Sequence, residues 1–325
     1  MVERSGFHAA ERRVQARVGV SEERQARAAA AIRPEMPLQH RQFFESQPIL
    51  FLGLIDGRGR PWATLAAGQP GFARAPCPDR LDIAREPVLA RSLGLQMGIG
   101  AKIGVLGIEL PTRRRNRMNG TIAGLLAGGG VAVAVDQSFG NCPQYIQARV
   151  FAEGRGAQSA SGRALDGLSA EARGIIEAAD TFFIASRSAD LGEGSSDGPA
   201  AGLDVSHRGG RPGFLGVNAD GSLSFPDFAG NRFFNTLGNI EADGRVGLLV
   251  PAFATGDALY LTGRASVDWN SDRVGRFEGA ERVVDVRPEA IWFVRHALPA
   301  AARLVEMSPR LEGTGTWPEA SRRDG

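Results

Sequence analysis

The strongest constraint on the fold is a short segment that occurs twice. Gly68-Gln69-Pro70-Gly71-Phe72 matches Gly210-Arg211-Pro212-Gly213-Phe214 at an offset of 142 residues. Three further matches follow in the same order, namely 80–83 with 222–225, 103–106 with 246–249 and 119–120 with 262–263, at offsets of 142, 143 and 143. Ordered matches at a nearly constant offset predict two copies of one unit of about 110–120 residues.

Each copy is predicted to be a small antiparallel β unit. Short apolar runs such as "PILFLGLI", "KIGVLGIEL" and "VAVAV" alternate with glycine-rich turns, which is typical of a small barrel. The strands at 48–56 and 181–189 pair at a shorter offset, so the second copy is about ten residues longer at 190–202. We expect the copies to pack like the subunits of a fused homodimer, with a ligand site at their seam.

The domain prediction follows from this repeat. An N-terminal helical segment spans 1–42, where Ser21 is a candidate N-cap and the helix stops before Pro34. The first unit spans 43–160, the second 161–310 and a tail 311–325. A helix is expected at about 163–179, between the two β regions.

Charge and cysteine content narrow the class of function. The net charge of +2 argues against a general nucleic-acid binder. Two cysteines form neither a disulfide framework nor a zinc site. The N-terminus does not have the layout of a signal peptide, and no apolar run reaches the roughly 18 residues of a membrane helix. We therefore expect a cytoplasmic protein with no membrane partner.

The segment "DVSHRGGRPGF" (204–214) precedes the repeated turn in the second copy alone. Ser206 and Arg208 project to the same face if the segment is a strand, and a hydroxyl beside a guanidinium suits a phosphate. The alternative is a polar hairpin edge, in which His207 has a structural role.

Two other segments carry polar side chains in patterns that suit an anion. "GNRFFNTLGNI" (230–240) places Asn231, Asn235 and Thr236 on a glycine-containing loop, which either wraps an anionic group or forms Asx turns. "TRRRNRMNGTI" (112–122) puts Arg113, Arg115 and Arg117 on one face of a strand, which can meet a phosphate or be solvated.

"SFGNCPQYIQAR" (138–149) contains Cys142 and Tyr145. No base stands near Cys142 in the sequence, so a packed thiol is favoured over a nucleophile. Tyr145 is a candidate hydrogen-bond donor. Signatures of a P-loop, a zinc site or a dinucleotide-binding α/β unit are missing from the sequence.

Taken together, "TFFIAS", "DVSHRGGRPGF", "LSFPDFAGNRFFNTLGNI", "VGLLV" and "LYLTGRASV" resemble the pyridoxamine 5′-phosphate oxidase-like, FMN-binding split-barrel family. "GVLGIELPTRRRNRMNG" and "FGNCPQYIQAR" resemble segments of its long members, so the resemblance covers residues 40–300. It implies a mainly β fold with flanking helices, in which two tandem split-barrel units form an internal pseudo-dimer with FMN at the seam.

The resemblance also implies a set of cofactor-binding residues. The phosphate positions correspond to Ser186, Ser206, Arg208, Asn235 and Thr236, and His207 and Asn231 complete the predicted set. Many relatives have a lysine where this chain has Asn235 or Thr236. The arginine-containing C-terminal segment of true pyridoxamine 5′-phosphate oxidases is not recognisable in "AIWFVRHALPAAARLVEM", so vitamin B6 phosphate is not the expected substrate.

The resemblance predicts an FMN-binding flavoprotein and an FMN-dependent oxidoreductase that acts on an unidentified small molecule, with NAD(P)H as a candidate electron donor. No catalytic residue and no metal ligand is assigned, because a flavin carries the redox chemistry itself. The alternative is a non-catalytic module that binds a flavin, a deazaflavin or haem, with His207 and His296 as the candidate haem ligands of the second unit. A homodimer is a further candidate assembly.

Overall fold

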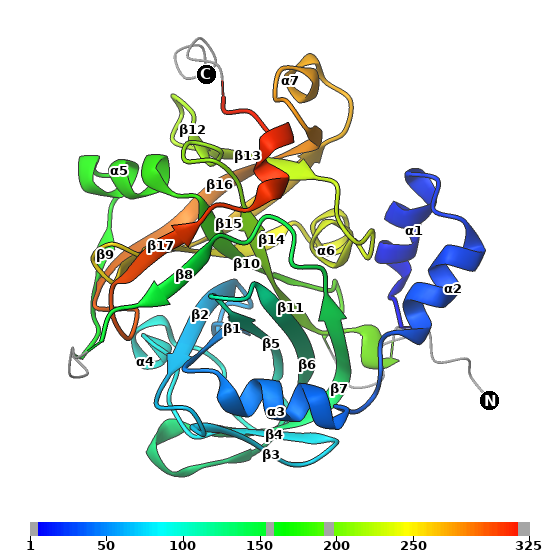
Figure 1. Cartoon of the computed structure of the whole chain (residues 1–325), viewed down its shortest axis with the longest axis vertical. Coiled ribbons are helices and arrows are strands. Elements are labelled where there is room, and N and C mark those ends of the chain that lie inside the picture. Colours follow the sequence, from blue (N-terminus) through cyan, green and yellow to red (C-terminus); the bar gives the residue numbers. More distant parts are fainter. Residues whose placement is uncertain (1–5, 154–158, 192–197, 318–325) are drawn as a thin grey trace.

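Two large antiparallel sheets form the body of the molecule (Figure 1). The structure is a computed structural model and describes residues 6–153, 159–191 and 198–317. The first sheet has the strand order β2-β1-β5-β6-β7-β4-β3, and the second has the order β11-β10-β14-β15-β16-β13-β12 with β9 added beside β16. The main path of each sheet therefore visits its strands in the corresponding order.

The strands of the first sheet are β1 (Ile49–Ile55), β2 (Pro61–Ala67), β3 (Ala73–Cys77), β4 (Arg80–Ile83), β5 (Lys102–Glu109), β6 (Arg114–Leu125) and β7 (Val131–Asn141). Those of the second are β9 (Ser161–Leu165), β10 (Thr181–Arg187), β11 (Leu203–Gly209), β12 (Gly216–Val217), β13 (Leu223–Phe228), β14 (Arg245–Ala252), β15 (Asp257–Asp268) and β16 (Ala280–Arg295). A separate ribbon pairs β8 (Ala148–Phe151) with β17 (Ala302–Glu306). In the described part of the chain both large sheets are open: β2 and β3 end the first, and β11 and β12 end the second.

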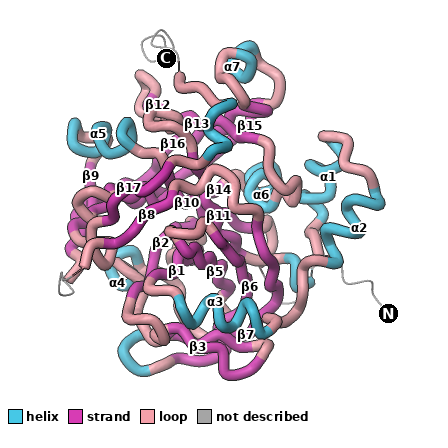
Figure 2. Tube along the Cα trace, viewed as in Figure 1, coloured by secondary structure: helices cyan, strands magenta, loops and turns pink. Residues whose placement is uncertain are grey.

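Most helices lie around the sheets, and α6 lies between α1 and the second sheet (Figure 2). They are α1 (Ala9–Arg17), α2 (Glu22–Ala30), α3 (Leu38–Ser46), α4 (Ala90–Leu93), α5 (Ala170–Ala178), α6 (Asn235–Ala242) and α7 (Asp272–Gly275). Ser21 caps α2 as expected, accepting a hydrogen bond from the Arg24 amide. No helix among the described residues is both long and apolar enough to cross a membrane.

The structure corrects the predicted start of the helix at 163–179 and extends the N-terminal helical segment. The helix predicted at 163–179 begins at Ala170, because residues 161–165 pair with β16 as strand β9 instead. Helix α3 runs beyond residue 42 and into the range assigned to the first unit. In the predicted tail, Trp317 is buried against Phe277 and donates a hydrogen bond to the Phe214 carbonyl, whereas 318–325 lie outside the described residues.

The repeated Gly-X-Pro-Gly-Phe segment forms the same turn in both sheets. The Phe72 amide donates to the Gln69 carbonyl at 3.0 Å, and the Phe214 amide donates to the Arg211 carbonyl at 2.9 Å. Gly71 and Gly213 have φ values of 91° and 87°, which a type II turn requires after its proline. The segment therefore makes the same turn after β2 in the first sheet and after β11 in the second.

Three apolar clusters divide the core. One belongs to the first sheet and α3, one belongs to the second sheet, and the third lies between the sheets. In the third cluster Phe51 of β1 stacks on Phe183 of β10, with ring centroids 3.5 Å apart and planes inclined by 14°. These two residues occupy corresponding positions in the two units, as expected for a contact across a two-fold axis.

Glycines allow the two sheets to approach closely and reciprocally. A Cβ at Gly104 of β5 would lie 2.8 Å from the Leu203 carbonyl oxygen of β11. A Cβ at Gly247 of β14 would lie 2.4 Å from the Pro61 carbonyl oxygen of β2. In one contact the glycine belongs to the first sheet and the carbonyl to the second, and in the other contact this is reversed. The interface between the sheets therefore has approximate two-fold symmetry.

Candidate ligand-binding site between the two sheets

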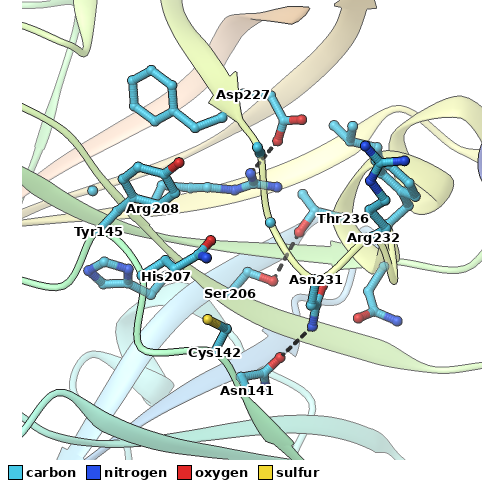
Figure 3. A pocket seen from close by; sticks show the side chains of 18 of the residues that line it. Asn141, Cys142, Tyr145, Ser206, His207, Arg208, Asp227, Asn231, Arg232 and Thr236 are labelled. Carbon is cyan, nitrogen blue, oxygen red and sulfur yellow. Dashed lines mark hydrogen bonds and ion pairs between the residues drawn. The ribbon is translucent and has the colours of Figure 1, made fainter. Parts of the chain in front are cut away.

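A polar cavity of about 110 Å³ lies at the seam of the two sheets (Figure 3). The first sheet contributes Arg115 and Arg117 of β6, Asn141 of β7 and the following loop with Gln144 and Tyr145. The second sheet contributes parts of β11 and β13, and the start of α6 closes the cavity.

Six of the seven residues predicted to bind a cofactor line this cavity. They are Ser206, His207, Arg208, Asn231, Asn235 and Thr236. Ser186 does not line it: its side chain is fully buried on β10 and accepts a hydrogen bond from Asn239 at 3.0 Å. His296 also does not line the cavity, and its amide donates to Asp257.

Arg117 connects the first sheet to the polar groups of the second. Its Nη2 donates to the Ser206 hydroxyl at 2.5 Å, and its Nη1 donates to the side-chain oxygen Oδ1 of Asn235 at 3.0 Å. The Thr236 hydroxyl lies 3.0 Å from that of Ser206. Asp204 balances the arginine charge at 3.4 Å. The guanidinium thus holds two hydroxyls and an amide at one wall of the cavity.

Arg208 of β11 forms an ion pair with Asp227 of β13, a strand from the other end of the same sheet (Figure 3). Asp227 also accepts from Arg282 Nε at 2.9 Å, so one carboxylate serves two guanidinium groups. Arg208 and Ser206 both face the cavity, as alternation along a strand predicts. Arg208 therefore lines the cavity with its charge already partly neutralised.

Buried polar atoms without a hydrogen-bond partner gather around the cavity. Among the described residues they include the Nε atoms of Arg115, Arg117 and Arg208, together with Asn141 Nδ2, Gln144 Oε1 and His207 Nε2. Such atoms cost free energy unless a ligand or water satisfies them. Four of the six are donors, so the cavity favours a group rich in acceptors.

The electrostatic environment agrees with this donor set. Burial, assisted by Arg117 and Arg208, lowers the pKa of Arg115 to about 9. Burial and the guanidinium groups of Arg115, Arg149 and Arg208 hold the pKa of His207 well below its ordinary value. His207 is therefore a neutral imidazole at physiological pH. An anion in the cavity would stabilise the arginine charges, which are crowded and poorly solvated.

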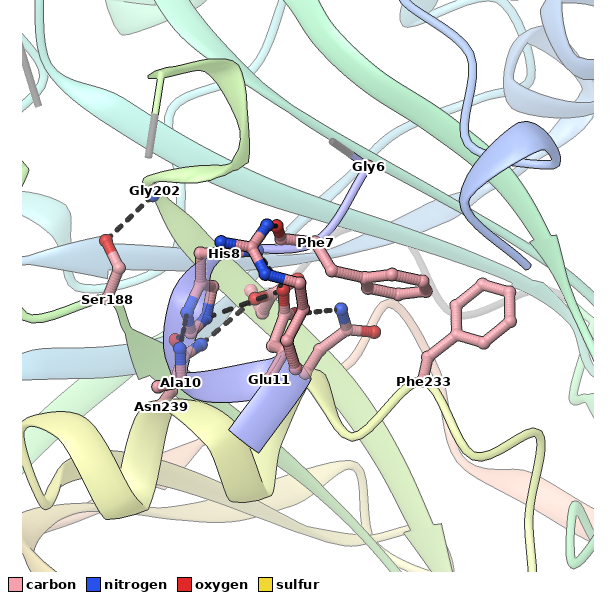
Figure 4. Close-up of polar contacts among 12 residues, drawn as sticks. Gly6, Phe7, His8, Ala10, Glu11, Ser188, Gly202, Phe233 and Asn239 are labelled. Carbon is pink, nitrogen blue, oxygen red and sulfur yellow. Dashed lines mark hydrogen bonds and ion pairs between the residues drawn. The ribbon is translucent and has the colours of Figure 1, made fainter. Parts of the chain in front are cut away.

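A buried polar network links the cavity to the N-terminal helix (Figure 4). Glu11 of α1 accepts hydrogen bonds from Asn235 and from the His8 amide. His8 Nε2 lies 2.9 Å from Asn239 Oδ1, and Asn239 donates to Asp204 at 3.0 Å. Burial, together with the Asp204 charge, raises the pKa of Glu11 well above its ordinary value.

Arg115, Arg117 and Glu11 contribute to the site but are not in the predicted set of cofactor-binding residues. Arg115 and Arg117 share a face of β6 as predicted, whereas Arg113 precedes the strand and donates to the Ile146 carbonyl. Their alternation was the signal for a phosphate-facing strand. Glu11 had no signal, because its partner Asn235 is more than two hundred residues away.

Cys142 and Tyr145 also border the cavity. Cys142 is unpaired and half-buried. Tyr145 adopts a left-handed backbone conformation with φ of 60°, and its ring lies 5.1 Å from that of Phe228. Tyr145 thereby forms part of an aromatic edge of the cavity.

No protein-family model and no curated protein matches the chain. Matching solved structures include HupZ of Group A Streptococcus, with 13% identity, a TM-score of 0.29 and coverage of 38% of this chain and 90% of the other. A "putative pyridoxamine 5′-phosphate oxidase" of Lactobacillus delbrueckii matches with 16% identity, a TM-score of 0.31 and coverage of 39% and 97%. General Stress Protein 26 of Bacillus anthracis matches with 12% identity, a TM-score of 0.25 and coverage of 41% and 94%. All three TM-scores are low, so the likeness is partial.

Proposed function

We propose that the chain binds FMN with its phosphate in the seam cavity and acts as an FMN-dependent oxidoreductase on a small molecule. The observation that carries the proposal is the convergence of Arg117 and Arg208, each with a buried and unsatisfied Nε, and of the Ser206 and Thr236 hydroxyls on one small cavity. Arginine forks and hydroxyls are the groups that bind phosphate in proteins. The resemblance of the sequence to the split-barrel flavoprotein family supports FMN as the phosphate ester.

The residues fit the phosphate end of FMN. Ser206, Thr236 and Arg208 would hold the phosphate, Asn231 and Asn235 would line its approach, and Ser186 would support the network from behind. The cavity volume of about 110 Å³ suits a phosphate group. Sites for whole drug-sized ligands measure about 300–1,000 Å³, so the remainder of FMN would lie outside this volume.

Bound FMN would supply the redox chemistry by accepting and donating a hydride equivalent. The chain's own residues would bind and orient the cofactor. A non-catalytic flavin, deazaflavin or haem module is the second candidate, because His207 is neutral and presents an unpartnered Nε2 at the cavity. A neutral imidazole nitrogen is the form that ligates a metal.

We also propose that the chain is a pair of tandem split-barrel units, an internal pseudo-dimer with a single FMN site. The positions that correspond to Arg115 and Arg117 in the second unit are Ala258 and Tyr260, both fully buried in the core between the sheets. The two-fold-related location is therefore filled by a methyl group and a buried aromatic ring and presents no guanidinium. We expect the chain to act in a reducing compartment such as the cytoplasm, because Cys77 and Cys142 are unpaired.

Substitution of Arg208 tests the binding site. A hydrogen bond to a charged group contributes about 1.5–3 kcal/mol, so Arg208→Ala should weaken FMN binding roughly 10- to 100-fold. Asp227 keeps its ion pair with Arg282 in this variant, so the fold should persist. The measurement is a flavin-fluorescence titration at fixed salt, which should also give a single FMN per chain for the wild type.

The matched control is Arg211→Ala. Arg211 lies in the shared turn and donates to the carbonyl oxygens of Leu311 and Thr314, away from the cavity. Its loss should leave FMN affinity unchanged while loosening the C-terminal segment. Equal FMN affinities for wild type and Arg208→Ala would contradict the proposed phosphate site.

The proposed reaction needs a separate test. Purified protein should be yellow and release FMN on denaturation, and with FMN present it should oxidise NADH or NADPH at steady state. An absorption scan that shows a Soret band would favour the haem alternative. Protein that is colourless and also fails to bind added FMN would overturn the flavoprotein proposal.

A further inference from the structure

The arginines of the cavity differ in how their charges are balanced. Arg117 is paired with Asp204, Arg208 with Asp227, and Arg282 with both Asp227 and Glu281. The Arg115 side chain makes no ion pair and no hydrogen bond with any residue that the structure describes. Among the cavity arginines of the described chain, Arg115 and Arg232 have no carboxylate partner; Arg232 is exposed to solvent, whereas the Nε atom of Arg115 is buried.

Three other side chains that line the cavity with Arg115 also have unsatisfied polar atoms. Asn141 Nδ2 and Gln144 Oε1, at the end of β7 and in the loop after it, have no partner among the described residues. His207 is 6% exposed, and its Nε2 is unpartnered as well. These three residues and Arg115 line the same cavity. Three of the four come from β6, β7 and the loop after β7, whereas the proposed phosphate contacts Ser206, Thr236 and Arg208 come from β11 and α6.

We infer that the Arg115 side of the cavity is a second anion-binding subsite, which receives a carboxylate or phosphate group of the small-molecule substrate. The inference rests on the proposed function, because the substrate group would bind beside the FMN phosphate. The guanidinium of Arg115 offers a planar fork of donors to such a group, and Asn141 adds an amide donor. His207 and Gln144 supply polar atoms that can pair with a hydroxyl or amine on the same molecule.

Comparison of the two sheets indicates that the fold does not need an arginine at the Arg115 position of β6. The position of the second unit that corresponds to Arg115 is Ala258, which is fully buried against the other sheet. The same strand position thus packs well with a methyl group. An arginine whose buried Nε has no partner and whose charge has no carboxylate costs free energy, so we attribute the presence of Arg115 on β6 to a ligand that compensates its charge.

The test uses inorganic phosphate as the probe on FMN-loaded protein, followed by isothermal titration calorimetry at constant ionic strength. Arg115→Gln should weaken phosphate binding about 10- to 100-fold and leave FMN affinity unchanged. Arg115→Lys keeps the charge and should retain part of the binding. The matched control is Arg114→Gln, which removes the same charge from an exposed neighbour whose guanidinium lies over Phe43.

Three results would overturn the inference. They are the absence of phosphate binding to FMN-loaded wild type, equal losses in Arg115→Gln and Arg114→Gln, and a loss of FMN affinity in Arg115→Gln as large as the loss of phosphate affinity. The last result would place Arg115 in the cofactor site. Failure of the proposed function is seen separately, as a wild type that binds no FMN. In that case the same phosphate titration of FMN-free protein, with the same variant pair, still decides whether the subsite exists.

Discussion

Glu11 illustrates how a single buried side chain can connect distant parts of the chain. Its carboxyl group lies between helix α1, helix α6 and the polar network around Asp204. A Cβ at Gly238 of α6 would lie 2.8 Å from Glu11 Cα, so the two helices are in very close contact there. Because Asn235 contacts both Glu11 and Arg117, the N-terminal helix helps to position the wall of the cavity.

The raised pKa of Glu11 predicts a pH dependence of stability. The folded protein retains the Glu11 proton above the ordinary value of 4.5, whereas the unfolded chain releases it. The unfolded state then binds fewer protons, so this residue's contribution to the free energy of unfolding falls as pH rises above about 4.5. Glu11→Gln removes this dependence and should gain stability relative to wild type between acidic and neutral pH. Urea denaturation across that range checks it, and parallel curves for the two proteins would contradict it.

At the scale of elements, the repeated turn depends on the glycine at its start. The phenylalanine at the end of the turn fills the space that a side chain at the glycine position would need. A Cβ at Gly68 would lie 2.8 Å from Phe72 Cβ, and a Cβ at Gly210 would lie 2.3 Å from Phe214 Cγ. Phe214 is buried in the core of the second sheet and cannot move away freely. The glycines at the two bulges, Gly120 and Gly263, are required for a similar reason, since an added Cβ would overlap a carbonyl oxygen of the neighbouring strand.

Gly210→Ala should therefore destabilise the protein by about 1–3 kcal/mol through overpacking. Gly174→Ala is the matched control, because Gly174 is exposed within α5 and an added Cβ meets nothing within 4 Å. Alanine in a helix interior is preferred to glycine by about 0.5–1 kcal/mol, so the control should gain stability. Thermal unfolding of both variants gives the comparison, and two shifts of the same sign would disagree with this account.

At the scale of the whole molecule, the two sheets depend on each other. The inter-sheet core contains aromatic residues of both units, including Phe51, Phe183 and Tyr260, all fully buried. Strand β9 precedes residue 166 yet pairs with β16, and β17 returns from the C-terminal part to pair with β8. Separation of the chain near its middle would expose the shared core and remove a partner strand on each side.

Residues 1–165 and 166–325, expressed separately, should accordingly be insoluble or should reassociate on mixing. The expected result follows from the apolar surface that each half would expose to water. Analytical ultracentrifugation of the mixture and of each half provides the measurement. Two halves that are each monomeric and unfold cooperatively on their own would show that the units are independent.

The sequence by itself determined the repeat, the turns and most of the strands, because these depend on local spacing of glycine, proline and apolar residues. It also placed Ser206, Arg208, Asn231, Asn235 and Thr236 in polar segments, all of which line one cavity in the fold. The start of α5 was missed, because β9 forms only through its pairing with β16, more than a hundred residues further along the chain.

Only the tertiary structure decided which polar segments meet. Arg117 contacts Ser206, and Arg115 lines the same cavity, because the two sheets approach closely at Gly104 and Gly247. No local pattern in the sequence encodes that approach. The same packing excluded Ser186 from the cavity and brought Glu11 to Asn235. Contacts between distant segments depend on how whole sheets fit together, so the residues of the cavity wall emerge from the folded chain and not from any one stretch of sequence.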